Sequence, residues 1–169
     1  MNTFTKGLML ASALLLAACD EPQRFGTGAD GTSDYHTEFG QAELAAATPD
    51  SPQYFQQFVG DSVLFAVDAY TLSAEARDIL DGQAEWLIEN SDFDAIVEGH
   101  ADERGTREYN LALGDRRANA ARDYLISRGI AGNRIKTVSY GKERPAQLCS
   151  NESCYSQNRR SVTSLVAGF

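Results

Sequence analysis

Residues 97–118 read VEGHADERGTREYNLALGDRRA, and this stretch decides how the chain folds. An apolar strand ends at Gly99, and a short, strongly charged loop follows it. Thr106 is a favourable helix N-cap, and apolar residues recur at helical spacing from there to the helix stop at Gly129. The stretch therefore predicts a strand, a charged loop and a long amphipathic helix.

One arginine of this helix lies where an apolar residue is expected. Arg117 falls in the middle of the apolar stripe, whereas Arg116 falls at its edge. Because burying a lone charge costs several kcal/mol, Arg117 needs an anion. An internal ion pair with Asp102 or Glu103 would supply one. The other hypothesis is that Asp102 and Arg117 flank a cleft and bind a ligand that carries both an amine and a carboxylate.

The segments around this stretch alternate between strand and helix patterns. The predicted elements are two short strands at 54–59 and 62–67, a helix at 73–90, a strand at 93–99, a helix at 106–128, a strand at 134–141, a polar loop at 142–158 and a strand at 159–166. From the strand at 62–67 onward the order is β-α-β-α-β-β. This order predicts an α/β (α+β) sandwich, in which helices pack on one face of a mixed sheet.

Composition limits the size of the protein and the class of its partners. The chain has 169 residues, of which 43% are hydrophobic and 23% are charged, so it suffices for one globular domain and a tail. The net charge of -9 argues against nucleic acid or an anionic membrane surface as partner, since both require clustered Lys and Arg.

The N-terminus has the features of a secretory signal. Lys6 precedes an apolar run at 7–18 that is too short to span a membrane stably. The run ends in Leu-Ala-Ala-Cys, which resembles the lipobox of bacterial lipoproteins, so we expect cleavage before Cys19 and lipidation of its thiol. Acyl chains would then hold the protein on a membrane. The alternative is an ordinary secreted protein with a chance cysteine.

Three segments follow from these patterns. Residues 1–18 are predicted to be a lipoprotein signal peptide. Residues 19–52, rich in Gly, Asp, Thr, Ser and Pro, are predicted to be the lipidated Cys and a flexible tether. Residues 53–169 are predicted to form the globular domain.

The two remaining cysteines, Cys149 and Cys154, are separated by four polar residues. In an oxidising periplasm such a pair forms a disulfide most simply. Two thiols with no nearby histidine fall short of a four-ligand zinc site. We therefore predict a disulfide and no metal.

Acidic residues and a histidine near the charged loop raise the alternative of a metal-dependent hydrolase. Glu98, His100, Asp102 and Glu103 are close in sequence, but the chain has only two histidines and His36 lies in the predicted tether. No set of nucleophile, base and orienting residue is evident. We therefore expect a binding protein, not an enzyme, without a cofactor.

Three motifs carry a resemblance to a known family. GHADERGTREYNLALGDRRANA at 99–120, VSYGKERPA at 138–146 and QNRRSV at 157–162 resemble the OmpA-like peptidoglycan-binding domain. The resemblance covers residues 63–166, and the motifs occur in the order typical of that family. The lipobox and tether suit its lipid-anchored members.

The family resemblance implies a ligand and a set of site residues. The ligand is the meso-diaminopimelate of the peptidoglycan stem peptide, whose free end carries an ammonium and a carboxylate on one carbon. By position, Asp102 would accept from the ammonium and Arg117 would bind the carboxylate. Leu113 would form the pocket wall and Asp68 its rim. Val67 stands where the family usually has Phe.

The resemblance also implies partners and a location. It suggests an outer-membrane lipoprotein whose domain faces the periplasm, fastens the membrane to peptidoglycan and acts in envelope integrity and cell division with TolB and other Tol components. A protein-binding adaptor that does not touch the wall is the alternative. Asp20 follows Cys19, and because Asp at that position retains some lipoproteins in the inner membrane, inner-membrane sorting is the alternative location.

Overall fold

The computed structural model describes residues 48–168. The predicted signal peptide, Cys19 and most of the predicted tether lie outside these residues. Within the described part, no helix has the length and apolar character needed to cross a membrane. The elements of the described part are α1 (Pro52–Tyr54), the π-helix η1 (Phe55–Gly60), β1 (Ser62–Leu64), α2 (Ala74–Glu89), β2 (Phe93–His100), α3 (Arg107–Ser127), the 3-10 helix η2 (Gly132–Arg134), β3 (Ile135–Gly141), α4 (Glu152–Asn158) and β4 (Arg160–Ala167).

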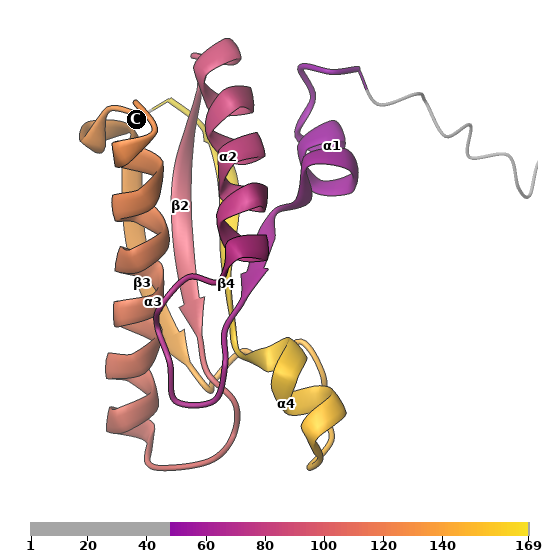
Figure 1. Cartoon of the computed structure of the whole chain (residues 1–169), viewed down its shortest axis with the longest axis vertical. Helices are drawn as coiled ribbons and strands as arrows, with labels where there is room; N and C mark the ends of the chain where they lie inside the picture. Colours follow the sequence, from indigo (N-terminus) through magenta and orange to yellow (C-terminus); the bar gives the residue numbers. More distant parts are fainter. Residues whose placement is uncertain (1–47, 169) are drawn as a thin grey trace, which may run out of the picture. The chain divides into compact units, whose positions relative to one another are not determined.

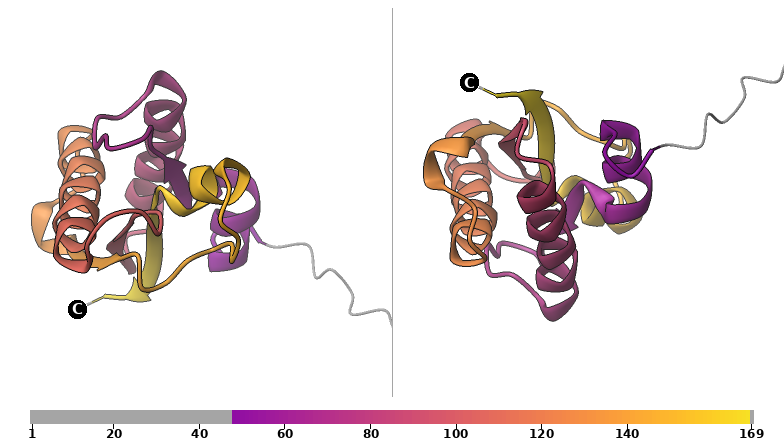
Figure 2. Two further views of the ribbon diagram at one scale, coloured as in Figure 1. Left: turned by 90° about the horizontal axis from the view of Figure 1, so that it is seen from below. Right: turned by 90° about the horizontal axis from the view of Figure 1, so that it is seen from above.

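The four strands form one mixed sheet in the order β1-β4-β2-β3. β4 runs antiparallel to both β1 and β2, whereas β2 and β3 are parallel. Val97 of β2 pairs with Thr163 of β4 on one side and with Thr137 of β3 on the other. The long helices α2 and α3 lie side by side on the same face of this sheet (Figures 1 and 2). The predicted α/β sandwich with helices on one face is confirmed.

The core lies between this sheet face and the two long helices. Leu80 and Leu87 of α2, Val97 of β2, and Ala121 and Leu125 of α3 are fully buried there. These side chains recur at the helical and alternating spacings that amphipathic helices and half-buried strands require. Packing of apolar faces therefore holds the helices on the sheet.

Both long helices begin where the sequence predicts them. The hydroxyl of Ser73 accepts from the backbone N–H of Ala76 at the start of α2, and that of Thr106 accepts from Tyr109 at the start of α3. Gly129 follows α3 with a φ of 108°, which a glycine adopts without strain. Local capping signals thus explain the helix boundaries.

Two glycines allow α3 to lie directly on β2. A Cβ atom at Gly99 would lie 1.8 Å from the carbonyl oxygen of Gly114, and a Cβ at Gly114 would lie 2.4 Å from the hydroxyl of Ser139. Only glycine fits both positions, because any side chain would collide with the facing element. This close approach brings the next turn of α3, with Arg117, to the end of β2.

The segment predicted to be a strand at 54–59 is instead helical, so that prediction is wrong. Ser51 caps α1 by accepting from the backbone N–H of Tyr54, and Pro52 occupies the first helical turn. Tyr54 and Phe58, four residues apart, stack their rings at 4.9 Å. The apolar residues here fit a helical spacing, but the segment is too short for spacing alone to distinguish a helix from a strand.

Residues 48–52, predicted to end the tether, contact the folded domain. The indole N–H of Trp86 donates to the carbonyl oxygen of Pro49 at 2.7 Å. Trp86 is buried between Phe55 and Phe93. This tryptophan therefore packs in the core.

The polar loop predicted at 142–158 ends in a helix, α4, so that prediction is wrong for its last residues. Asn151 caps α4 by accepting from the N–H groups of Ser153 and Cys154. The predicted disulfide between Cys149 and Cys154 is present and spans the start of this helix. Because so short a helix shows little apolar periodicity, the sequence pattern does not reveal it.

Candidate binding pocket

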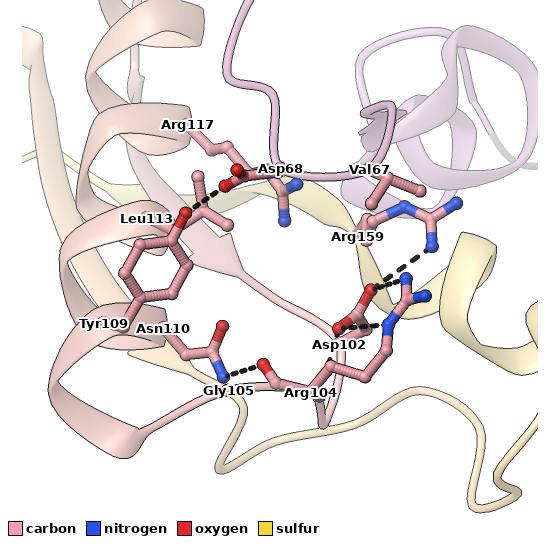
Figure 3. A pocket seen from close by; sticks show the side chains of 10 residues that line it. All are labelled: Val67, Asp68, Asp102, Arg104, Gly105, Tyr109, Asn110, Leu113, Arg117 and Arg159. Carbon is pink, nitrogen blue, oxygen red and sulfur yellow. Dashed lines mark hydrogen bonds and ion pairs between the residues drawn. The ribbon is translucent and has the colours of Figure 1, made fainter.

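A pocket of about 310 Å³ opens where β2 ends and α3 begins (Figure 3). Its walls come from the loop after β1, the loop between β2 and α3, the first half of α3, and the residue before β4. The lining residues are Val67, Asp68, Asp102, Arg104, Gly105, Tyr109, Asn110, Leu113, Arg117 and Arg159.

All five residues that we expected to bind the ligand line this one pocket. Leu113 and Arg117 project from α3, and Asp102 comes from the loop after β2. Val67 and Asp68 reach it from the loop after β1, and Val67 is exposed at its edge. The fold therefore brings together segments that lie far apart in the sequence.

Five further lining residues were not predicted to belong to the site: Arg104, Gly105, Tyr109, Asn110 and Arg159. Arg159 is the most informative, because it is buried beside the pocket, directly before the last strand. The signal that was available is its place in the family motif at 157–162.

Arg117 is a fully buried cation held by backbone carbonyls. Its Nε donates to the carbonyl oxygen of Ala69 at 2.8 Å, its Nη1 to that of His100 at 2.8 Å and its Nη2 to that of Ala66 at 3.1 Å. Each Nη also carries a second N–H, so these three bonds leave donor capacity unused. Within residues 48–168, Arg117 forms no ion pair with a carboxylate.

Arg117 remains charged at neutral pH despite its burial. Burial lowers its pKa to about 10, and the negative charge of Asp102 opposes that shift. A buried cation held only by neutral carbonyls attracts an anion. The internal ion pair with Asp102 or Glu103 that we considered from the sequence is therefore not what the structure contains.

Asp102 has two other arginines as partners. The Nη2 of Arg104 donates to Asp102 Oδ2 at 2.6 Å, and the Nε of Arg104 donates to Oδ1 at 3.3 Å. The backbone N–H of Arg104 also donates to Oδ1, at 3.1 Å, in an Asx-turn arrangement. Arg159 Nη1 donates to Oδ2 at 3.3 Å. Glu103 points elsewhere and accepts from the hydroxyl of Tyr155.

The Asp102 carboxyl is ionised at neutral pH. Burial alone would raise its pKa, but the hydrogen bonds from Arg104 and Arg159 outweigh burial and hold the pKa below its ordinary value. Asp102 therefore presents a negative charge to the pocket, so it can accept from a cationic ligand group.

Asp68 forms the opposite rim together with Tyr109. The hydroxyl of Tyr109 donates to the carboxylate of Asp68. Asp68 has a φ of 53°, in the left-handed region that aspartate tolerates better than most residues. This backbone conformation turns the loop after β1 over the pocket.

The charged groups of the pocket lie on two sides of a central hollow. Arg117 and Asp68 lie on one side, and Asp102 with Arg104 and Arg159 lies on the other (Figure 3). The hollow between them suits a small molecule that carries a positive and a negative group. No Ser, Cys or His lines the pocket, and residues 48–168 hold no group of three or more side chains suited to bind a metal ion.

His100 contributes its backbone to the site, not its side chain. The imidazole is 2% exposed and packs beside the ring of Tyr140, with Glu98 at 3.7 Å from its Nε2. Burial, followed by the positive charge of Arg160, lowers the pKa of His100 to about 4. The imidazole is therefore neutral at pH 7, and only the carbonyl oxygen of His100 reaches Arg117.

The part of the chain that forms this fold and this pocket matches a known protein family. Residues 64–159 match the OmpA family, a span that includes α2, α3 and every residue that lines the pocket. The chain belongs to the OmpA family. The predicted family membership is thereby confirmed.

Several similar proteins share one name, peptidoglycan-associated lipoprotein. The peptidoglycan-associated lipoprotein of Rhizobium meliloti is 48% identical over 158 residues, which cover 94% of this chain and 85% of the relative. That of Brucella melitensis is 54% identical over 120 residues, which cover 71% of each chain. The crystal structure of the peptidoglycan-associated lipoprotein from Burkholderia pseudomallei is 34% identical, with a TM-score of 0.63, and the match covers 66% of this chain and 96% of that one.

These OmpA-family relatives agree with the expectation that the chain is not an enzyme. Their shared name describes a lipoprotein associated with peptidoglycan.

Proposed function

We propose that this protein binds peptidoglycan non-covalently through the diaminopimelate of the stem peptide. The observation that carries the proposal is the state of Arg117, a buried cation without a carboxylate partner among the described residues. Arg117 keeps unused donors and lines a pocket that also contains the ionised Asp102. A group with an ammonium and a carboxylate on one carbon complements both charges.

The pocket supplies a partner for each part of that group. Arg117 would bind the carboxylate and Asp102 the ammonium, and charge-assisted hydrogen bonds of this kind contribute roughly 1.5–3 kcal/mol each. Leu113 would pack against the methylene chain of diaminopimelate. Val67 and Asp68 would border the entrance, where Val67 offers an aliphatic contact in place of an aromatic one.

The proposed function includes a place in the cell envelope. A lipid on Cys19 and a tether at 19–52 would hold the domain to the outer membrane while its pocket binds the wall in the periplasm. The names of the relatives support an envelope lipoprotein. As a member of the Tol-Pal system with TolB as partner, the protein would fasten the outer membrane to the wall and support cell division; Asp20 keeps inner-membrane sorting as the alternative.

Co-sedimentation with isolated sacculi tests the wall-binding proposal. We expect Asp102→Ala and Arg117→Ala to abolish co-sedimentation, and free diaminopimelate to compete with the wild-type protein. Arg116→Ala is the matched control, since Arg116 is exposed and its guanidinium lies over the ring of Tyr70, outside the pocket. Circular dichroism would establish that each variant folds. Undiminished binding by both pocket variants would refute the site.

A further inference from the structure

Asp102 already has a cation, the guanidinium of Arg104, where a ligand ammonium would bind. The guanidinium of Arg104 contacts both carboxylate oxygens of Asp102, at 2.6 Å to Oδ2 and 3.3 Å to Oδ1. An ammonium that approaches Asp102 from the pocket must therefore share the carboxylate with Arg104 or displace it. Arg104 lies on the pocket side, because it lines the same hollow.

Of the two arginines on Asp102, Arg104 is the one that can move away. Its side chain is 45% exposed and rests over the ring of Tyr155 at 4.6 Å, whereas that of Arg159 is 7% exposed. Arg159 is also held by the carbonyl oxygen of Phe65 at 3.1 Å and by Glu152 at 2.6 Å. An exposed arginine on a loop exchanges partners more easily than a buried one with three fixed acceptors.

The balance of charge in the pocket limits which ligands can displace Arg104. The lining contains three arginines and two aspartates, so arginine is in excess by one charge. A simple amine would add a further positive charge and leave Arg104 without its partner. A zwitterion would leave the excess unchanged. A ligand with one ammonium and two carboxylates would neutralise it.

Glu152 does not remove this excess. It lies 3.7 Å from Arg104, but its side chain is 59% exposed, it does not line the pocket, and it already accepts from Arg159. Solvent screens an ion pair of this kind. Once displaced from Asp102, Arg104 would therefore lack a carboxylate partner inside the pocket, and a second carboxylate of the ligand could supply one.

We propose that Arg104 is a specificity-determining residue of the pocket: the ligand ammonium takes its place on Asp102, and the released guanidinium binds a second carboxylate of the ligand. This inference rests on the proposed function and narrows its ligand. A diaminopimelate acylated on one amine has one ammonium and two carboxylates. The pocket thus prefers stem peptides in which the carboxylate next to the acylated amine is free over those in which it is amidated.

Two small probes measure this preference on the full-length protein in detergent by calorimetry. One is diaminopimelate acetylated on one amine, and the other is the same compound amidated at the carboxylate next to the acetylated amine. We expect the wild-type protein to prefer the dicarboxylate probe by about tenfold, the size of effect given by one additional charge-assisted hydrogen bond. In Arg104→Gln the preference should fall to near one, with the amide probe bound at least as tightly as before.

Arg107→Gln is the matched control. It removes the same charge from an exposed arginine that pairs with Glu143 at 3.1 Å and does not line the pocket, so the tenfold preference should persist. If Arg104→Gln fails to fold, Arg104→Lys keeps the charge without the bidentate geometry and should show a reduced preference. Equal binding of both probes to the wild type, or a full preference in the folded Arg104 variant, would overturn the assignment. Failure of both probes to bind the wild type would instead refute the proposed function.

Discussion

The guanidinium of Arg117 donates from Nη1 to the carbonyl oxygen of His100 at 2.8 Å, and this bond joins the middle of α3 to the last residue of β2. Two further bonds, to Ala66 and Ala69, tie the loop after β1 to the same side chain. One buried arginine therefore organises the three segments that surround the pocket, and it also supplies the charge that the pocket presents.

Arg117→Lys should weaken both stability and ligand binding. A lysine keeps the charge but cannot satisfy three carbonyl oxygens with fixed planar geometry, so we expect the free energy of unfolding to fall by about 3 kcal/mol. Urea unfolding measures the change. Arg116→Lys, at the exposed neighbouring position, should stay within about 0.5 kcal/mol of wild type. A change of that small size in Arg117→Lys would contradict the organising role of this side chain.

Gly99→Ala should destabilise the protein by about 3 kcal/mol or more, since the added Cβ would meet the backbone of α3 and neither element can yield without moving the other. Its Cβ would lie 1.8 Å from the carbonyl oxygen of Gly114. Gly82→Ala is the contrasting variant, because Gly82 lies inside helix α2 and the added Cβ would only touch Val59 of η1 at 3.6 Å. That variant should gain up to about 1 kcal/mol from helix propensity. Thermal unfolding of the two variants should therefore shift in opposite directions.

Stability should fall as the pH drops from about 6.5 to about 4 because of His100. Burial, then the charge of Arg160, lowers the folded-state pKa of this histidine from 6.5 to about 4, so between these values the unfolded state binds more protons. The loss from pH 7 to pH 5 should be about 2 kcal/mol by linkage. The glutamine of His100→Gln cannot take up a proton. The free energies of unfolding of this variant at pH 7 and pH 5, measured with urea, should therefore differ by about 2 kcal/mol less than those of the wild type. An unchanged difference would show that other groups govern the pH dependence.

Reduction of the Cys149–Cys154 disulfide should lower stability by about 2 kcal/mol, as expected for a short closed loop. The bond spans the start of α4, which carries Glu152 and Tyr155, the residues that contact Arg159 and Arg104. We therefore also expect a modest loss of affinity for wall fragments. Chemical denaturation with and without reductant measures the first effect. A Cys149→Ser/Cys154→Ser variant should be insensitive to the reductant, and a sensitive one would point to another cause.

The long helices and the central strands could be predicted from the sequence because their signals are local. Ser73 and Thr106 cap their own helices, Gly129 ends α3, and apolar spacing marks the buried faces. The shorter elements were predicted less well. The segment at 54–59 is helical and not the predicted strand, and α4 lies within the predicted loop. A few residues carry little periodicity, and their structure depends on what they pack against.

The helix pattern also placed Arg117 in the middle of the buried stripe, which the structure confirms, and Arg116 at the edge of that stripe, where the structure finds it exposed. The remaining expected pocket residues came from the family resemblance, and the structure brings them to the same hollow. Neither the helix pattern nor the family resemblance predicted which residues pair with Arg117 and with Asp102. We had considered Arg117 with Asp102, whereas Asp102 pairs with Arg104 and Arg159.

The sequence by itself determined that this protein has two capped helices over a sheet and a buried arginine that needs an anion, because spacing, caps and side-chain charge are properties of neighbouring residues. Only the tertiary structure decided that carbonyl oxygens 48 and 51 residues away satisfy part of Arg117 and that Asp102 meets an arginine 57 residues away. Such contacts depend on how the strands pair and on how closely α3 approaches β2. Their energies belong to the folded chain and leave no periodic signal in the sequence.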